Sequence, residues 1–132
     1  MNNARFTAPS AVILGDPEIG EGTWLGYFTI LDGSEGLVIG KNCSIASGVH
    51  IYSHSTHLLT TTLGKRKTGQ VTIGDNVAVG ANTIIHYGCT VGSNSVVGAL
   101  SQLRPHTVVG EFEYWSGNPA KFIRRLRMET VE

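Results

Sequence analysis

The fold of this protein is decided by residues 71–110, which read VTIGDN-VAVGAN-TIIHYG-CTVGSN-SVVGAL-SQLRPH-TVVG when divided into groups of six. The third residue of every group is aliphatic, and glycine follows it in five of the seven groups. A period of six fits neither an α-helix, with 3.6 residues per turn, nor a simple strand, with a period of two. It fits a triangular coil with three short flat faces, each of which directs one large aliphatic side chain inward.

The same spacing recurs nearer the N-terminus, in two runs that end at Leu31 and Ile51. A single coil cannot bury its own inward face, so stability requires several stacked coils. The sequence therefore predicts an all-β fold, a left-handed parallel β-helix of about four to five coils. A chain of 132 residues has room for one domain, and we expect residues 1–132 to form a single domain.

Two interruptions break the repeat. Two extra residues fall within Asp32–Gly36, which predicts a small bulge at a coil corner. A longer excursion, residues 53–70, contains His54, His57 and the basic triplet 65–67. Long loops in compact domains are usually functional or disordered, and the two histidines favour function here.

The repeat fades after Val109, and residues 119–130 have a helix-prone composition. Pro119 suits the first position of a helix, with Asn118 as its N-cap. We therefore expect a short C-terminal α-helix that caps the open end of the coil stack.

Composition limits the classes of partner. Ten acidic and ten basic residues balance, so no global field attracts the chain to nucleic acid. No segment approaches the run of about 18 apolar residues that spans a bilayer, and the first residues lack the pattern of a signal peptide. We expect a cytoplasmic protein with no membrane span and no nucleic-acid partner. Cys43 and Cys89 occupy inward repeat positions, where reduced core thiols are expected.

Several segments resemble the hexapeptide-repeat acyltransferases, in particular sugar O-acetyltransferases of the maltose, galactoside and polysaccharide type. The resemblance lies in residues 22–32 (GTWLGYFTILD), 49–57 (VHIYSHSTH), 71–76 (VTIGDN) and 117–121 (GNPAK). It implies a homotrimer with active sites between neighbouring subunits. It also implies an enzyme that transfers an acetyl group from acetyl-coenzyme A to a hydroxyl or amine of a sugar or nucleotide sugar, without a metal, as in polysaccharide biosynthesis.

The resemblance further implies that a loop histidine is the general base, because imidazole can accept a proton near neutral pH. Two candidates remain open. Xenobiotic acetyltransferases place the base at the position of His57, whereas relatives with a Tyr-Ser/Thr-His sequence place it at His54. In the maltose-type enzymes the corresponding position is Thr56 here, and two other family positions also differ, so maltose itself is not expected to be the acceptor.

The remaining site residues follow from the same resemblance. Asp32, Tyr52 and His86 are expected on the acceptor side, although Asp32 is also suited to a turn before Gly33. The coenzyme A arm is expected to pass four small corner residues, and its phosphates to contact basic residues near the C-terminus or in the triplet 65–67. These candidates are Gly80, Ala81, Gly98, Ala99, Lys121 and Arg124. Coil packing and a solvated basic surface would explain the same residues equally well.

Two other functions remain as alternatives. A γ-type carbonic anhydrase shares this fold, and residues 85–92 (IHYGCTVG) resemble part of its sequence. That enzyme needs three histidines on one metal, with two of them five residues apart, and Ala81 stands five residues before His86. The second alternative is a non-catalytic β-helix that serves as a scaffold or partner subunit.

Overall fold

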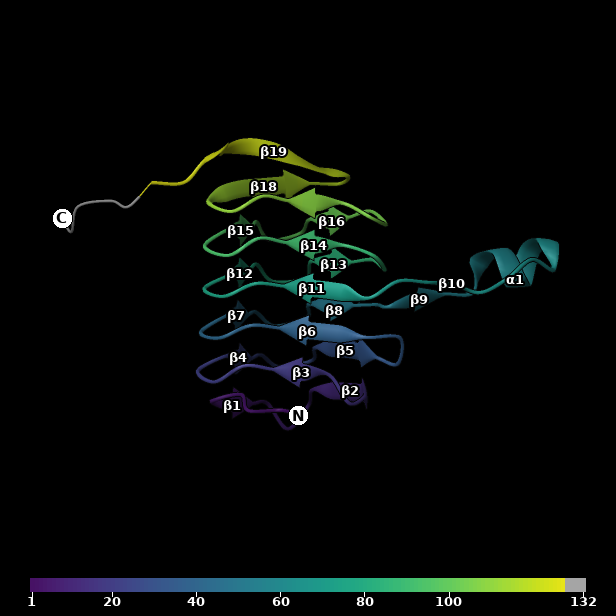
Figure 1. The fold of residues 1–132 in the computed structure, drawn as a ribbon, viewed down its shortest axis with the longest axis horizontal. Coiled ribbons are helices and arrows are strands. Elements are labelled where there is room, and N and C mark those ends of the chain that lie inside the picture. Colours follow the sequence, from purple (N-terminus) through teal and green to yellow (C-terminus); the bar gives the residue numbers. More distant parts are fainter. Residues whose placement is uncertain (128–132) are drawn as a thin grey trace.

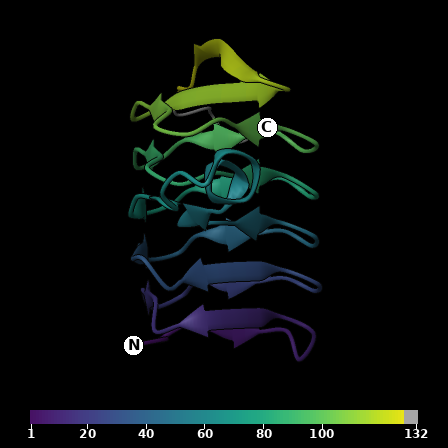
Figure 2. The same cartoon turned by 90° about the vertical axis from the view of Figure 1, so that its right-hand side faces the viewer.

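The computed structural model describes residues 1–127, which form a stack of triangular coils with one long loop (Figures 1 and 2). Three parallel sheets form the faces of the stack, and the chain visits them in the same order in every coil. Face 1 contains β3 (Glu18–Ile19), β6 (Leu37–Ile39), β11 (Val71–Ile73), β14 (Thr90–Val91) and β17 (Val108–Val109).

Face 2 contains β1 (Phe6–Thr7), β4 (Trp24–Leu25), β7 (Ser44–Ile45), β12 (Ala78–Val79), β15 (Val96–Val97), β18 (Glu113–Gly117) and β19 (Ala120–Arg125). Face 3 contains β2 (Val12–Gly15), β5 (Ile30–Gly33), β8 (His50–Ile51), β13 (Ile84–Ile85) and β16 (Gln102–Leu103). The segments that join the faces are called the 1–2, 2–3 and 3–1 corners below. The left-handed parallel β-helix expected from the repeat is confirmed.

The six-residue repeat defines the core. The aliphatic residue at the third position of each group is buried in every case, as at Ile73, Ile85 and Val97, each of which has no exposed surface. The residue before it points outward, so Ile84 is half-buried beside the fully buried Ile85. Each inward side chain stabilises the stack by about 1.5–3 kcal/mol through the removal of apolar surface from water. The core therefore runs the whole length of the stack.

Glycine follows the inward aliphatic residue because adjacent coils approach closely there. A Cβ built on Gly74 would lie 2.8 Å from the Ser93 nitrogen, which is closer than real Cβ contacts. At the 1–2 corner the tight turn instead uses asparagine with positive φ, as at Asn76 and Asn94. Asparagine tolerates this left-handed conformation better than most residues. Here its side chains also connect the coils, since Asn76 Nδ2 donates to Asn94 Oδ1 at 3.2 Å.

The long loop leaves the stack at the 3–1 corner and returns to it at β11 (Figure 1). Its base is a short antiparallel pair, β9 (His54–Ser55) with β10 (Lys67–Thr68), and its tip contains the helix α1 (His57–Thr62). The backbone nitrogen of Gly69 donates to the Ser53 carbonyl at 3.0 Å and closes the loop at its base. Residues 53–70 thus project from an otherwise regular stack.

The α-helix expected over residues 119–130 is wrong for the described part of that range. Ala120–Arg125 form β19, which pairs antiparallel with β18, and Asn118-Pro119 form the connecting turn. Residues 128–130 lie outside the described part of the chain. The physical reason is the free edge of face 2: β18 is the last strand of a parallel sheet, and β19 supplies the partners that its unpaired backbone groups need. Trp115 and Phe122 also pack together across the hairpin, with ring centroids 6.5 Å apart.

Cys43 and Cys89 are buried and not joined by a disulfide, as expected from their inward positions. Burial raises the pKa of both thiols, which favours the protonated form. Within residues 1–127, no helix has the length and hydropathy needed to cross a membrane.

Candidate active site

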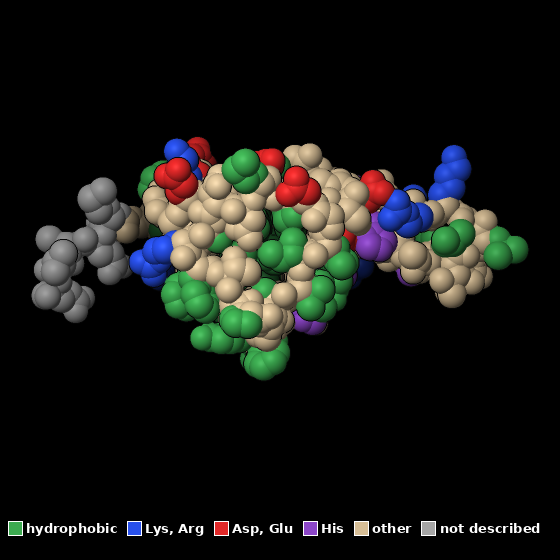
Figure 3. All heavy atoms as spheres, turned by 90° about the horizontal axis from the view of Figure 1, so that it is seen from below, with side chains coloured by type: hydrophobic (Ala, Val, Ile, Leu, Met, Phe, Trp, Pro, Cys, Tyr) green, Lys and Arg blue, Asp and Glu red, His purple; other side chains and the backbone are tan. Residues whose placement is uncertain are grey.

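The two interruptions of the repeat meet at the 3–1 corner. The parallel register pairs Leu31 of β5 with Ile51 of β8, so the bulge after Leu31 stacks directly on the base of the loop. The Glu35 backbone nitrogen donates to Ser53 Oγ at 3.0 Å, which fixes the bulge to the loop. Viewed along the stack from its N-terminal end, histidine, acidic and basic side chains gather where the loop leaves (Figure 3). Side chains that are 20 residues apart in sequence therefore share one site.

The centre of this site is the pair Asp32 and His54. Their Oδ2 and Nδ1 atoms are 2.6 Å apart; the Asp32 side chain has no exposed surface, and 29% of the His54 side chain is exposed. Asp32 Oδ1 accepts hydrogen bonds from the Ser34 hydroxyl (2.6 Å) and backbone nitrogen (3.0 Å). Asp32 Oδ2 also accepts one from the Ser53 backbone nitrogen at 3.1 Å. Both carboxylate oxygens are thus fully engaged within the protein.

This hydrogen bonding determines the charge of Asp32. Burial alone would raise the pKa of its carboxyl group, but the donors on Ser34, Ser53 and His54 outweigh burial and leave the pKa below its ordinary value. Asp32 is therefore ionised at neutral pH. A carboxylate only accepts hydrogen bonds, so His54 Nδ1 must carry the proton that joins the two residues. This tautomer, assigned from the hydrogen-bond network, leaves a lone pair on His54 Nε2.

His57 has a different environment. Its Nδ1 lies 2.7 Å from Ser55 Oγ, which also accepts from the His57 backbone nitrogen at 3.4 Å. A serine hydroxyl can donate one hydrogen bond and accept two, so these contacts are compatible with either tautomer of His57. The Asp32 carboxylate can only accept, so His54 alone of the two histidines is held by its partner in the tautomer that a general base requires.

Two adjoining cavities lie beside these histidines. The first has a volume of about 350 Å³ and is lined by Leu14, Tyr52, His54, Ser55, Thr56 and His86. The second, of about 600 Å³, is lined by Ser55, His57, His86, Tyr87, Gln102, Arg104 and Pro105. They share Ser55 and His86, and we call the combined depression the loop-corner groove. The loop-corner groove brings together four residues that the sequence analysis predicted as site residues, namely Tyr52, His54, His57 and His86.

Asp32 was expected to contact the acceptor, but the structure places its side chain beneath His54. As an acceptor-binding residue it would need an exposed oxygen, but its carboxylate is buried beneath His54 and bonded on both oxygens. Its contacts orient the imidazole instead.

The four small residues expected to border coenzyme A lie at a different corner. Gly80, Ala81, Gly98 and Ala99 follow face 2 and form the 2–3 corner, whereas the loop-corner groove lies at the 3–1 corner. Coil stacking explains the glycines: a Cβ on Gly80 would lie 2.3 Å from the Ala99 nitrogen, and one on Gly98 would lie 3.0 Å from Tyr114 Oη. Within one chain, the histidine site and this small-residue corner are not brought together.

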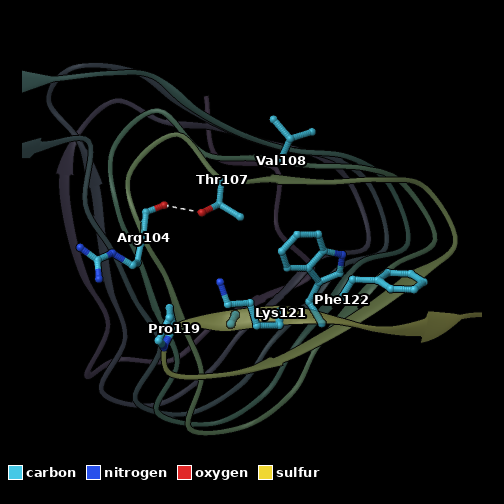
Figure 4. A pocket seen from close by; sticks show the side chains of 8 residues that line it. Arg104, Thr107, Val108, Pro119, Lys121 and Phe122 are labelled. Carbon is cyan, nitrogen blue, oxygen red and sulfur yellow. Dashed lines mark hydrogen bonds between the residues drawn. The ribbon is translucent and has the colours of Figure 1, made fainter.

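Lys121 and Arg124 lie on β19 at the C-terminal end of the stack. Lys121 points into a cavity of about 820 Å³ over the end of the core, bordered also by Thr107, Trp115 and Pro119 (Figure 4). The Arg124 guanidinium stacks over the Tyr114 ring at 5.4 Å. Of the triplet 65–67, Arg66 forms an ion pair with Glu35. These cations therefore belong to two separate parts of the molecule, β19 and the long loop.

Sequence reasoning missed Ser34, Ser53 and Arg104. Ser34 lies within the segment that holds the two-residue insertion, and Ser53 is the first residue of the long loop, so both mark breaks in the repeat. Arg104 replaces the glycine that usually follows the inward aliphatic residue, as His86 also does.

Residues 1–127 contain no group of three or more His, Cys, Asp or Glu side chains that could hold a metal. His50 Nδ1 lies 3.1 Å from Tyr52 Oη, and His86 Nε2 lies 2.7 Å from Gln102 Oε1.

Comparisons with known proteins agree with the coil architecture. The family model described as the hexapeptide repeat of succinyl-transferase matches residues 70–99. Gamma carbonic anhydrase 2 of Arabidopsis thaliana mitochondria is 34% identical over 96% of this chain. The match covers 50% of that protein, so the chain spans about half the length of this relative.

Two solved structures are similar over most of the chain. A variant of AntD, an N-acyltransferase from Bacillus cereus crystallised with dTDP-4-amino-4,6-dideoxyglucose and coenzyme A, has a TM-score of 0.83 and 25% identity, covering 96% of this chain and 72% of AntD. The polySia-specific acetyltransferase NeuO has a TM-score of 0.72 and 28% identity, covering 88% of this chain and 51% of NeuO. The repeat, the coil stack and these matches agree in showing the fold of the hexapeptide-repeat acyltransferases, a left-handed parallel β-helix, which this chain resembles.

Proposed function

We propose that this protein is an acyltransferase that moves an acetyl group from acetyl-coenzyme A to a hydroxyl or amine of a sugar or nucleotide sugar. His54 acts as the general base and Asp32 orients it. The observation that carries this proposal is the 2.6 Å contact between His54 Nδ1 and the buried Asp32 carboxylate. It leaves a basic nitrogen facing a cavity that is large enough for a substrate group.

The chemistry follows from this arrangement. His54 Nε2 accepts the proton of the acceptor group as that group attacks the thioester carbonyl. Asp32 stabilises the imidazolium that forms. The tetrahedral intermediate then collapses, the carbon–sulfur bond breaks, and the departing thiolate takes the proton from His54. The products are the acetylated acceptor and coenzyme A, with no net change at the histidine. General base catalysis of this kind contributes about 10²–10⁴-fold in rate.

The partners of the reaction are supported by the similar proteins. AntD was crystallised with coenzyme A and a nucleotide sugar, and NeuO is named an acetyltransferase. The 2–3 corner of this chain presents exposed Tyr27, Phe28 and Leu100, with 47%, 71% and 73% of their surface exposed. Apolar side chains exposed along one corner in this way favour contact with another protein surface. A homotrimer would bring the 2–3 corner of one chain against the 3–1 corner of its neighbour, and so join the two halves of the site.

Calorimetric titration of acetyl-coenzyme A into the purified protein tests the proposal. We expect micromolar binding at one site per chain, followed by release of free thiol when sugars and nucleotide sugars are supplied as acceptors. A protein that binds no acetyl-coenzyme A would contradict the proposal and favour a non-catalytic role as a scaffold or partner subunit.

A second candidate is a zinc-dependent hydratase, because the curated relative with 34% identity is a gamma carbonic anhydrase. The residues do not fit that site. Catalytic zinc requires three protein ligands, and the chain offers His50 on face 3 and His86 at the adjoining 3–1 corner, while Ala81 has no ligating atom. Zinc as a parallel titrant discriminates the two candidates. Tight zinc uptake with CO₂ hydration, and no binding of acetyl-coenzyme A, would favour the hydratase.

A further inference from the structure

The part of the loop-corner groove farthest from His54 has an unusual combination of charges. It is lined by Ser55, His57, His86, Tyr87, Gln102, Arg104 and Pro105, among which no side chain is acidic. Arg104 is the one permanent charge in that lining. The groove is thus electropositive at this end whatever the protonation of the two imidazoles.

The positive charge of Arg104 also has no partner among residues 1–127. Among residues 1–127 its guanidinium forms no ion pair and no hydrogen bond, and only its carbonyl accepts one, from Thr107 Oγ1 at 2.7 Å. Arg104 also borders the cavity at the end of the stack, and in Figure 4 its guanidinium points outward, away from Lys121. Other arginines are engaged within the chain: Arg5 with Trp24, Arg66 with Glu35, Arg124 with Tyr114, and Arg125 with Glu113. A guanidinium with five free donors beside a cavity is suited to a phosphate or carboxylate.

Neighbouring polar groups add to this preference. The His57 imidazole lines the same cavity as Arg104 and can donate a hydrogen bond from a protonated ring nitrogen to an anion. Gln102 is held in place by its contacts with His86 (2.7 Å) and Asn118 (3.2 Å), so the wall next to Arg104 is fixed before any ligand binds.

The strand register gives the distance along the stack between Arg104 and the level of the general base. Ile51 pairs with Ile85, and Ile85 with Leu103, so Tyr52, His86 and Arg104 occupy successive levels of the stack at the same corner. With coils spaced about 4.8 Å apart, Arg104 lies about 10 Å along the stack from Tyr52. A pyranose ring placed between these levels could present a reacting group to His54 at one end and an anomeric phosphate to Arg104 at the other.

We propose that Arg104, assisted by His57, forms a subsite for the anionic part of the acceptor, and that the acceptor is a phosphate or diphosphate ester of a sugar. The inference rests on the proposed function, since it takes His54 as the base at the other end of the groove. It gives His57 a binding role and assigns Arg104 to acceptor specificity.

The test uses inorganic pyrophosphate as the probe. The full-length chain is first saturated with coenzyme A, so that sites for the donor's phosphates are filled, and pyrophosphate is then titrated by calorimetry. We expect one site per chain, weakened at least about tenfold by Arg104→Gln and partly restored by Arg104→Lys. His57→Gln should weaken it severalfold. Lys41→Gln, which removes one exposed positive charge at the 1–2 corner, is the matched control and should leave binding unchanged.

Each contrary outcome has a distinct meaning. Pyrophosphate binding that is absent with coenzyme A bound, or that is insensitive to Arg104→Gln, would overturn the subsite. Loss of affinity for coenzyme A itself in Arg104→Gln would assign the cation to the donor and would also overturn it. His54→Ala should bind pyrophosphate normally. If the protein transfers no acetyl group yet shows Arg104-dependent pyrophosphate binding, then the acyltransferase proposal fails while the anion site remains.

Discussion

His54 and His57 lie three positions apart in the same loop, yet their Nδ1 atoms have chemically different partners. His54 Nδ1 contacts the Asp32 carboxylate, whereas His57 Nδ1 contacts the Ser55 hydroxyl. A carboxylate only accepts hydrogen bonds and so fixes the tautomer of His54, with a lone pair on Nε2, whereas a hydroxyl can donate or accept and does not fix that of His57. At the scale of single residues, the hydrogen-bond partner of Nδ1 determines whether the ring is held in the form that can act as a general base.

This difference predicts unequal effects of matched substitutions. His54→Gln should lower kcat by at least about 10²-fold, because glutamine cannot accept the acceptor's proton. His57→Gln should leave kcat within about tenfold of the wild type and raise the KM for the acceptor. Thiol release from acetyl-coenzyme A measures both. A large loss of kcat in His57→Gln with a mild effect in His54→Gln would reverse the assignment of the base.

The charge of Asp32 also contributes to the stability of the folded protein. Its folded-state pKa is lowered from the ordinary value of 3.8, so its ionised form stabilises the fold. That stabilisation is fully present above pH of about 4 and is lost as the pH falls through the lowered folded-state pKa. Asn at this position has one oxygen, so the backbone nitrogen of Ser34 or that of the buried Ser53 loses its acceptor, at a cost of about 1–3 kcal/mol where the donor is buried.

We therefore expect Asp32→Asn to be less stable than the wild type at neutral pH, and the difference to narrow as the pH falls below about 4. Urea unfolding across a pH series measures it. A difference that stays constant over the whole series would show that the charge of Asp32 does not contribute. Ser34→Ala, which removes one donor to the same carboxylate, should reproduce a smaller part of the loss.

At the scale of elements, the two-residue strands of the stack from β3 to β17 repeat one rule: the second residue is buried and the first faces outward. In β13 the neighbours Ile84 and Ile85 are the same residue type, but the side chain of Ile84 faces outward and that of Ile85 is buried in the core. A comparison within this one strand isolates the effect of burial from that of side-chain type.

Ile85→Ala should destabilise the protein by about 2–5 kcal/mol, since it leaves a cavity in a core that cannot collapse around it. Ile84→Ala, the control, should cost less than about 1 kcal/mol. Chemical denaturation measures the difference in unfolding free energy between the two variants, provided that their m-values are unchanged. Equal losses would mean that the inward and outward positions of the coil are wrongly assigned.

At the scale of the whole molecule, one chain separates the two regions that the proposed reaction would combine. The histidine site lies at the 3–1 corner, and the small-residue corner expected to border coenzyme A lies at the 2–3 corner. A stack with three faces has three separate corners, so no rearrangement of one chain brings two of them together. The activity that we propose therefore depends on a neighbouring copy.

We expect sedimentation analysis to give a mass three times the 14.1 kDa of the chain. Activity per chain should fall when dilution dissociates this assembly, while the circular dichroism of the coils stays unchanged. Mixed assemblies of His54→Ala and Ala99→Glu chains should regain activity that neither variant has alone. Full activity in a dissociated single chain would contradict a site shared between copies.

The sequence by itself determined the coil architecture, because a six-residue period has few solutions: each inward aliphatic must be buried, and only stacked coils bury all of them. It also located the functional region, since residues that break a strict repeat are not needed for its core. Only the tertiary structure decided that Asp32 lies beneath His54, because that contact joins an insertion in one coil to a loop in the next through their register. The C-terminal strand was likewise decided by the tertiary structure. Residues 119–125 have local helix signals, but the free edge of β18 supplies backbone partners that no local pattern reveals.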